Sequence, residues 1–253
     1  MNHLTGSCKF AIRVTMQSGK RTTYQEKYQE IGSSHVLIRD AILENIPEGR
    51  TILDVGVSDG VLARGLPPRA YRLYGIEPVR SWGRAAMRFY EDIFIGTLGQ
   101  APDKYLEGKD VVVCADVLEH VSQGREQLAR LVRLQSPHTI FLVSVPNVAH
   151  LWIRLNLLFG RFEYRERGIL DKTHVHFYTK KSFLELLSSS GLDVVWCRPT
   201  PVPLGLIHPW FRTSLLGRSV YRMVAMVTRF VPTLLGYQFV ALARPRGNDA
   251  KGC

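Results

Sequence analysis

Short apolar segments alternate with helix-like segments through most of this chain, and this alternation limits the possible folds more than any other feature. Residues 110–115 are apolar at nearly every position, as strands covered on both faces of a sheet are. Further strands are predicted at 51–55, 72–76, 92–95, 139–145, 192–197 and 237–243. Helices are predicted at 34–46, 122–135 and 180–190, where apolar residues recur at helical spacing. The pattern predicts one α/β domain with a mostly parallel sheet and helices on both faces.

Two segments interrupt this rhythm. The first, 146–178, follows the carboxyl end of a strand, where open α/β sheets bind their ligands. It contains an apolar helix-like piece, which is either a lid over an acceptor pocket or an ordinary packed helix. The second, 199–235, is long, basic and apolar. We expect the domain to span 31–246, between an irregular lead-in at 1–30 and a tail at 247–253.

The charge is strongly basic and unevenly placed. The 253 residues include 33 Lys and Arg against 22 Asp and Glu, a formal net charge of +11. Residues 1–193 hold 25 basic and 21 acidic side chains, whereas 194–253 hold eight and one. A hydrophobic content of 45% excludes a disordered chain, so the charge belongs to a folded protein. Such a basic balance is typical of proteins that bind nucleic acid, an anionic membrane surface or a phosphate-bearing substrate.

The four cysteines lie far apart, with no C-x-x-C spacing, which argues against a zinc site and against a disulfide scaffold. No apolar run within residues 1–20 is long enough for a signal peptide. No segment elsewhere has the roughly 18 uninterrupted apolar residues that a membrane span needs. We therefore expect a cytoplasmic protein.

A glycine-containing turn links the first predicted strand to a helix. It reads Asp54-Val-Gly56-Val-Ser58-Asp-Gly60. Glycines there let a ligand approach the backbone closely, and the helix N-terminus offers free N–H groups. Glu77 ends the next strand, at about the twenty-residue spacing of dinucleotide-binding folds, where a carboxylate can accept hydrogen bonds from both ribose hydroxyls. The pair predicts a nucleotide-type site, against the alternative of a plain strand–turn–helix joint with a surface glutamate.

These residues resemble the class I S-adenosylmethionine (SAM)-dependent methyltransferases. Residues 52–60 are similar to that family's first motif, D-x-G-x-G-x-G, with Ser58 at the central glycine. The resemblance continues at 74–78, at 111–121, which ends its motif in Leu-Glu-His, and at 144–147, 157–162 and 171–179. Among such enzymes it resembles bacterial small-molecule and cell-surface-glycan methyltransferases. The resemblance implies a Rossmann-like, seven-stranded, mostly parallel sheet whose last strand is antiparallel. It also implies SAM as cofactor and S-adenosylhomocysteine (SAH) as product.

The resemblance further implies which residues bind SAM. Asp54 orients the glycine loop, whose residues Gly56, Ser58 and Gly60 line the methionine end, and Glu77 holds the ribose. The remaining implied contacts are Tyr28 to the methionine carboxylate, Thr97 and Leu98 in place of the family's acid at the adenine, and Asp116 and Val117 beneath the methionine.

Methyl transfer from a sulfonium is an in-line displacement, so the enzyme mainly aligns donor and acceptor and excludes water. A hydroxyl acceptor also needs a general base. His174 is predicted as that base, with Asp171 or Glu119 orienting it and His176 nearby, because an imidazole titrates near neutral pH. The alternative is that Asp171 and His174 only pin their loop. We expect His120 to pack beside the cofactor. A metal site of Asp171, His174 and His176 lacks a further ligand, so no bound metal is expected.

The basic segment predicts an amphipathic helix within 204–231. At a helical rotation of 100° per residue, Arg218, Arg222 and Arg229 fall on one side, and apolar residues face away from them. Such a helix can lie on an anionic membrane surface, which would place the protein at the inner face of the membrane. The alternative, which we expect here, is that its apolar face packs on the sheet and its arginines face water.

The leading hypothesis is a SAM-dependent methyltransferase that acts at oxygen on a small-molecule, glycan or glycolipid acceptor. RNA methylation is an alternative suggested by the charge. Against nucleic acid, residues 115–120 lack the Pro-Pro-aromatic turn used by enzymes that methylate nucleobase amino groups. A non-catalytic SAM-fold binding protein is a further alternative, left open by Ser58 and by the absent acid after the third strand. The sequence does not indicate an oligomeric state.

Overall fold

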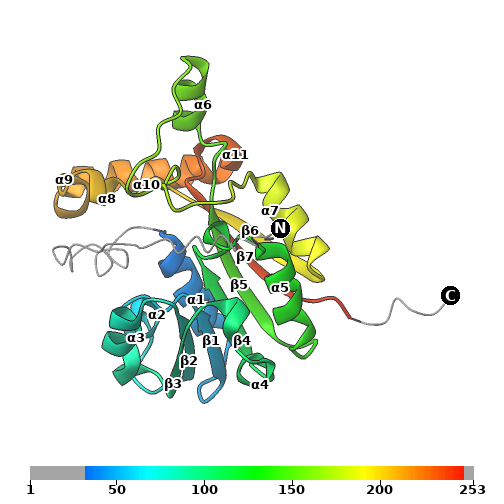
Figure 1. The fold of residues 1–253 in the computed structure, drawn as a ribbon. Helices are drawn as coiled ribbons and strands as arrows, with labels where there is room; N and C mark the ends of the chain where they lie inside the picture. Colours follow the sequence, from blue (N-terminus) through cyan, green and yellow to red (C-terminus); the bar gives the residue numbers. More distant parts are fainter. Residues whose placement is uncertain (1–31, 248–253) are drawn as a thin grey trace, which may run out of the picture.

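The computed structural model describes residues 32–247, which form a seven-stranded sheet in the order β3-β2-β1-β4-β5-β7-β6 (Figure 1). The strands are β1 (Thr51–Val55), β2 (Arg72–Glu77), β3 (Asp92–Ile95), β4 (Val111–Ala115), β5 (Ile140–Pro146), β6 (Leu192–Thr200) and β7 (Gln238–Pro245). All seven predicted strands are confirmed, to within a few residues at their ends. The predicted lead-in with Tyr28, and the tail from residue 248, lie outside the described residues.

Strands β1 to β5 pair in parallel, and β7 runs antiparallel to both of its neighbours. The Rossmann-like, mostly parallel sheet with an antiparallel last strand is therefore confirmed. The strand order reverses between β1 and β4, because the chain first builds outward through β2 and β3 and then returns. Open α/β sheets bind ligands at such a switch point, outside the carboxyl ends of the strands.

Helices cover both faces of the sheet, as predicted (Figure 1). One face carries α1 (Ser34–Asn45), α2 (Val61–Gly65) and α3 (Arg80–Ala86), and the other carries α4 (Asp103–Leu106), α5 (Gly124–Arg133) and α7 (Lys180–Ser189). Neighbouring residues of β1 divide between them: Ile52 joins the core under α1, and Leu53 joins the core under α5. Because adjacent strand residues point to opposite faces, an apolar strand supplies both cores.

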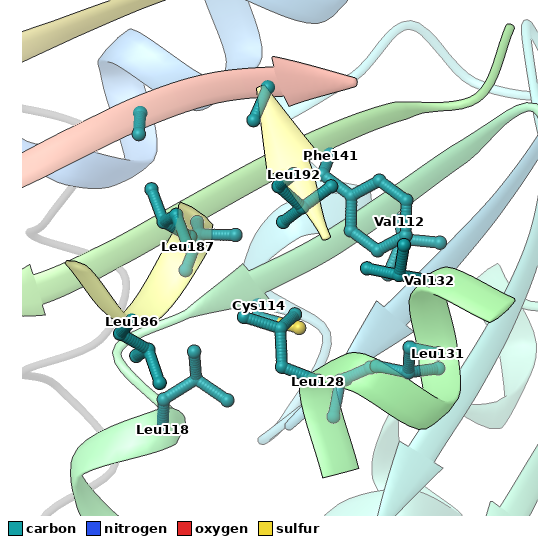
Figure 2. Packing of buried hydrophobic residues seen from close by; sticks show 14 of the residues in the cluster. Val112, Cys114, Leu118, Leu128, Leu131, Val132, Phe141, Leu186, Leu187 and Leu192 are labelled. Carbon is teal, nitrogen blue, oxygen red and sulfur yellow. The ribbon is translucent and has the colours of Figure 1, made fainter. Parts of the chain in front are cut away.

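Figure 2 shows the core under α5, in which Leu128, Leu131 and Val132 meet Phe141 of β5 and Leu187 of α7. The three α5 residues recur at helical spacing, and all are buried, as predicted. Burial of a Leu or Phe side chain contributes roughly 1.5–3 kcal/mol. This layer therefore holds β4 and β5 firmly beneath the edge where the candidate site lies.

The two segments that interrupt the alternation of strands and helices, 146–178 and 199–235, leave the sheet where β5 and β6 end. Pro146 ends β5 beside Gln238, which begins β7, and Gln238 also lies beside Thr200 at the end of β6. Figure 1 shows α6, α10 and α11 together beyond this end of the sheet. The elements there are α6 (Leu151–Leu158), α8 (Leu204–Ile207), α9 (Trp210–Thr213), α10 (Leu215–Phe230) and α11 (Pro232–Leu235).

Helix α10 does not pack its apolar face on the sheet, so that prediction is wrong. Its buried residues are Gly217, Tyr221 and Thr228, and the last two lie two turns apart on one side of the helix. Leu216, Met223 and Phe230 are 67%, 54% and 80% exposed. The inward side of α10 is thus filled by tyrosine and threonine, and its most apolar side faces outward. Among residues 32–247, no helix is both long enough and apolar enough to cross a membrane.

Candidate active site

The loop between β1 and α2 approaches the end of β4 closely. Gly56, Ser58 and Gly60 have positive φ angles of 82°, 53° and 88°. A Cβ atom on Gly56 would lie 2.6 Å from Val117 Cγ2, so a larger residue fits only if Val117 moves. Ser58 adopts the left-handed region at a cost of roughly 1–2 kcal/mol. Its Oγ is buried and has no hydrogen-bond partner within residues 32–247, which fits a loop that a ligand completes.

Glu77 holds this loop from the end of β2. Its carboxylate accepts a hydrogen bond from the Ser58 N–H at 2.7 Å and another from the Val79 N–H at 2.8 Å. Burial raises the pKa of Glu77, and the two hydrogen bonds oppose that rise. Each carboxylate oxygen has a further lone pair, so the group can also accept hydrogen bonds from ribose hydroxyls.

A second buried carboxyl, that of Asp54 in β1, lies close enough to Glu77 for their charges to interact. Tyr90 donates a hydrogen bond from its hydroxyl to Asp54 Oδ2 at 2.6 Å. Burial raises the pKa of Asp54 to about 7; the Tyr90 hydrogen bond lowers it, and the charge of Glu77 raises it further. Two mutually repelling buried acids favour a cationic ligand. SAM carries a sulfonium and an ammonium group, so these residues fit the cofactor that the sequence implies.

The other predicted SAM-binding residues lie at the ends of β3 and β4. Thr97 is exposed and hydrogen-bonds Gln100, while Leu98 is buried in the core. Asp116 has a positive φ of 56°, and its Oδ1 accepts a hydrogen bond from Ser144 Oγ at 2.6 Å. Because β1 to β4 run in parallel, the structure brings all predicted SAM-binding residues except Tyr28, which lies outside the described residues, to one edge. Their contacts to SAM stay predictions.

Glu119, His120 and His174 come together beside this edge. Glu119 and His120 belong to the 3-10 turn η4 (Leu118–His120) after β4, and His174 comes from the loop before α7. The backbone joins the two segments, because the N–H groups of Val175 and His176 donate to the Glu119 carbonyl at 2.8 and 3.1 Å. The centroids of the His120 and His174 rings lie 4.7 Å apart.

The His174 ring is suited to accept a proton at neutral pH. Its Nδ1 lies 3.1 Å from the carbonyl oxygen of Ile169. Burial lowers the pKa of His174 below its ordinary 6.5, and His120 lowers it further. The hydrogen bond to Ile169 and the charges of Asp171 and Asp116 oppose this shift. The ring is therefore neutral at pH 7, and Nε2 carries a lone pair.

The side chains of the other two predicted catalytic residues do not hydrogen-bond the His174 ring, although the Asp171 carbonyl accepts from the His174 N–H at 3.0 Å. Asp171 Oδ1 accepts from the N–H and the hydroxyl of Thr173, at 2.8 and 2.7 Å. His176 Nε2 lies 2.9 Å from the Ser122 carbonyl oxygen. The hydrogen bond that orients His174 comes from Ile169, a backbone group that no sequence pattern marks. His120 is not among the predicted catalytic residues, although the Leu-Glu-His motif at the carboxyl end of β4 is a signal for it.

Two cavities adjoin this edge, and Trp152 and Val202 border both. One, of about 420 Å³, lies between α6 and α10 and is lined mainly by apolar side chains such as Leu155 and Met223. The other, of about 430 Å³, is lined by Tyr237, by Ile169 and by Arg161, Arg165 and Arg167. It approaches the cluster of Glu119, His120 and His174, because Ile169 hydrogen-bonds His174.

Residues 24–196 match the sequence profile of a family described as a methyltransferase domain. Ubiquinone biosynthesis O-methyltransferases are similar curated proteins. That of Rickettsia canadensis is 25% identical over 149 residues, which are 56% of this chain and 62% of the relative. That of Rickettsia typhi is 26% identical over 151 residues, 56% of this chain and 60% of the relative. The match thus spans about three fifths of the length of these relatives.

Solved structures share the fold. The magnesium protoporphyrin IX methyltransferase of Synechocystis PCC 6803, with bound SAH, has a TM-score of 0.56 and 14% identity, and the match covers 85% of this chain and 82% of that one. A SAM-dependent methyltransferase from Archaeoglobus fulgidus has a TM-score of 0.51 and 15% identity, with 87% and 97% covered. Identities this low show the fold alone. The profile match, which covers more than half of the chain, shows that this chain belongs to the class I SAM-dependent methyltransferase family.

Proposed function

We propose that this protein transfers the methyl group of SAM to a hydroxyl oxygen of a small-molecule or glycan acceptor. The observation that carries the proposal is the position of His174 beside the cofactor edge. Val117 packs against Gly56 of the glycine loop, and Asp116, the preceding residue, lies close enough to His174 to affect its pKa. The similar curated proteins are named O-methyltransferases, which supports oxygen as the acceptor atom.

His174 can promote removal of the proton from the acceptor hydroxyl in two ways. Its Nε2 can accept the proton directly, because the pKa of the ring is lowered and the ring is neutral at pH 7. It can also hold a cation that lowers the pKa of the hydroxyl. In either case the hydroxyl oxygen forms the new bond to the methyl carbon while the carbon–sulfur bond breaks, and its electron pair stays on sulfur.

Replacement of His174 tests both ways at once. We expect His174→Ala to reduce turnover by about 10²–10⁴-fold. We expect SAM affinity to stay within about twofold, because the predicted SAM contacts come from the ends of other strands. His138, exposed on the turn before β5, is the matched control for a histidine replacement, and His138→Ala is expected to behave as wild type. A deletion strain supplies the unmethylated acceptor in its lipid and glycan extract, and SAH release measures turnover. Wild-type turnover by His174→Ala would remove His174 from the mechanism.

The cavities support an acceptor with an apolar part, such as a glycolipid. The cavity between α6 and α10 offers apolar side chains almost throughout, which suits a hydrocarbon chain. The second cavity is lined by Arg161, Arg165 and Arg167, which can pair with a phosphate or carboxylate. The deletion strain is then expected to accumulate a lipid-soluble species lighter by one methyl group. Accumulation of a purely water-soluble glycan instead would contradict the lipid part of the acceptor.

An anionic membrane surface is the partner that the exposed side of α10 supports. Met223, Val227 and Phe230 are exposed there, although removal of these apolar side chains from water is favourable in free energy. No acidic residue occurs between Asp193 and Asp249, so this surface carries only positive charge. A basic helix with an apolar side binds the interface of an anionic membrane. We infer that the protein works from the cytoplasm, at the inner face of the membrane.

Vesicle flotation tests the membrane partner. Wild type is expected to float with vesicles that contain about a third anionic lipid and to float less at high salt, because screening weakens the arginine contribution. Met223→Glu with Phe230→Glu is expected to abolish flotation. Leu43→Glu places the same charge on an exposed leucine of α1, far along the chain, and is expected to float as wild type. Absence of wild-type flotation, or equal flotation of the α10 variant, would contradict the proposal.

A further inference from the structure

Glu119, His120 and His174 form a set of metal-ligand side chains that come from two segments far apart in the sequence. One ligand atom from each residue lies within 4.8 Å of the other two. The carboxylate belongs to a residue that is 1% exposed, whereas His120 is exposed and His174 is half-buried. The set is therefore anchored in the protein on one side and open on the other.

The backbone around the set holds both histidines in the tautomer that a metal ligand needs. His120 Nδ1 lies 3.2 Å from the Thr173 carbonyl oxygen, and His174 Nδ1 lies 3.1 Å from the Ile169 carbonyl oxygen. A carbonyl oxygen can only accept, so in these contacts Nδ1 carries the proton and Nε2 carries the lone pair. Metal-bound histidines typically have the second ring nitrogen anchored in this way. Two independent anchors, one for each ring, distinguish this set from a chance meeting of side chains.

The two segments that supply the ligands are also tied to each other. The Glu119 carbonyl accepts the N–H groups of Val175 and His176, the two residues that follow His174. His120 approaches the same loop through Thr173. The distance between the ligands is thus set by backbone hydrogen bonds and does not depend on the side chains alone.

We propose that Glu119, His120 and His174 bind a divalent transition-metal cation such as Zn²⁺ or Mn²⁺. Two imidazoles and one carboxylate suit these ions better than Mg²⁺ or Ca²⁺, which prefer oxygen ligands. Ligand atoms of a tetrahedral ion lie roughly 3.3 Å apart, so ligand atoms that lie within 4.8 Å of one another close in around the ion when it binds. Three protein ligands leave coordination positions open, as in catalytic metal sites.

The use of this cation rests on the proposed methyl transfer, although its binding does not. A hydroxyl coordinated to the cation has a lowered pKa and releases its proton to solvent. The oxygen then attacks the methyl carbon, the carbon–sulfur bond breaks, and the electron pair leaves with sulfur as SAH. His174 acts here as a ligand and not as the base, because its Nε2 lone pair cannot serve both purposes.

Metal binding is measured directly on the full chain, freed of any affinity tag and treated with a chelator. Titration calorimetry with ZnCl₂ and with MnCl₂ is expected to show one site in wild type. Glu119→Gln and His120→Ala are expected to weaken binding at least tenfold, and His138→Ala is expected to bind as wild type. His120 is exposed, so its replacement leaves the core intact. No stoichiometric binding by wild type, or unchanged binding by His120→Ala, would overturn the proposal.

Binding of Co²⁺ tests the metal site independently of the proposed methyl transfer. Co²⁺ in the site is expected to give a visible absorption band that is lost in His120→Ala, whether or not an acceptor is known. With the acceptor extract, chelated protein is expected to lose most of its turnover and to regain it with Zn²⁺ or Mn²⁺. Full turnover of protein shown to be free of metal would overturn the catalytic use of the cation and leave His174 as the base. Absence of turnover under every condition, with the cobalt band present, would overturn the methyl-transfer proposal and support the site.

Discussion

Two regions of this molecule differ in where they place charged and apolar side chains: the cofactor half, at the ends of β1 and β2, and the acceptor half, at α6 and α10. At the ends of β1 and β2, two acids are buried and held by hydrogen bonds from Tyr90, Ser58 and Val79. At α6 and α10, apolar side chains such as Leu158 and Phe230 are exposed by 76% and 80%. A site for a fixed, polar, cationic ligand needs preorganised polar groups, whereas a surface for a lipid-like partner needs uncovered apolar groups. Substitutions in the two regions are therefore expected to have different effects.

Among the effects expected on cofactor binding, that of Glu77 is the largest. Glu77→Gln replaces one acceptor oxygen by an amide NH2 group, which cannot accept a hydrogen bond from a backbone N–H, and it removes the negative charge at the predicted ribose position. We expect SAM affinity to fall about 10–100-fold, which corresponds to about 1.4–2.8 kcal/mol. Calorimetric titration with SAM measures it. Glu91→Gln, at an exposed acid before β3, is the control and is expected to bind as wild type. Equal affinity of Glu77→Gln would remove the ribose role.

The second prediction concerns the close approach of Gly56 to Val117. Gly56→Ala adds a Cβ at 2.6 Å from Val117 Cγ2 and forces an alanine to adopt a positive φ angle. We expect the free energy of unfolding to fall by roughly 1–3 kcal/mol, and SAM affinity to fall with it. The double variant Gly56→Ala with Val117→Ala removes the clash but keeps the φ strain. It is expected to regain part of the lost stability in denaturant unfolding; no recovery would mean that the approach is unimportant.

The third prediction is a pH dependence that belongs to the cofactor half. The pKa of Asp54 in the folded protein, about 7, lies above its ordinary 3.8. Between these values the folded protein binds more protons than the unfolded chain, so the free energy of unfolding falls as pH rises, by at most about 1.4 kcal/mol per pH unit. SAM affinity rises over the upper part of this range, because the cation favours ionised Asp54. Asp54→Asn is expected to flatten both profiles, as followed by thermal unfolding and by titration. Unchanged profiles in that variant would assign the pH dependence to another group.

The smallest expected effect on stability lies in the acceptor half. Leu158→Ser with Phe159→Ser is expected to change the free energy of unfolding by no more than about 0.5 kcal/mol per residue, because both side chains are mostly exposed. The same variant is expected to raise the KM for a lipid-like acceptor while kcat stays close to wild type. Ile153→Ala, at a buried position of the same helix, is the contrast and is expected to cost roughly 2–5 kcal/mol. A comparable loss of stability in both variants would show that α6 is an ordinary packed helix.

Local patterns in the sequence were sufficient for the sheet and for the cofactor edge. Strand β4 is apolar at every position, and the glycine turn followed by Glu77 marks the site before any contact is known. Local patterns were insufficient for α10, whose apolar residues lie at helical spacing but face outward. Periodicity shows that a helix has two sides; it does not show which side the rest of the protein covers.

The sequence by itself determined the strands, the family and the strand ends at which SAM is predicted to bind, because these depend on short segments and on the parallel alignment of the strands. Only the tertiary structure decided that His174 lies against His120 and Glu119 and takes its orientation from Ile169. The physical reason is that the backbone N–H groups of Val175 and His176 donate to the Glu119 carbonyl and so join η4 to a loop more than fifty residues later. Every residue except proline has both backbone groups that make such bonds, so no side-chain pattern predicts them.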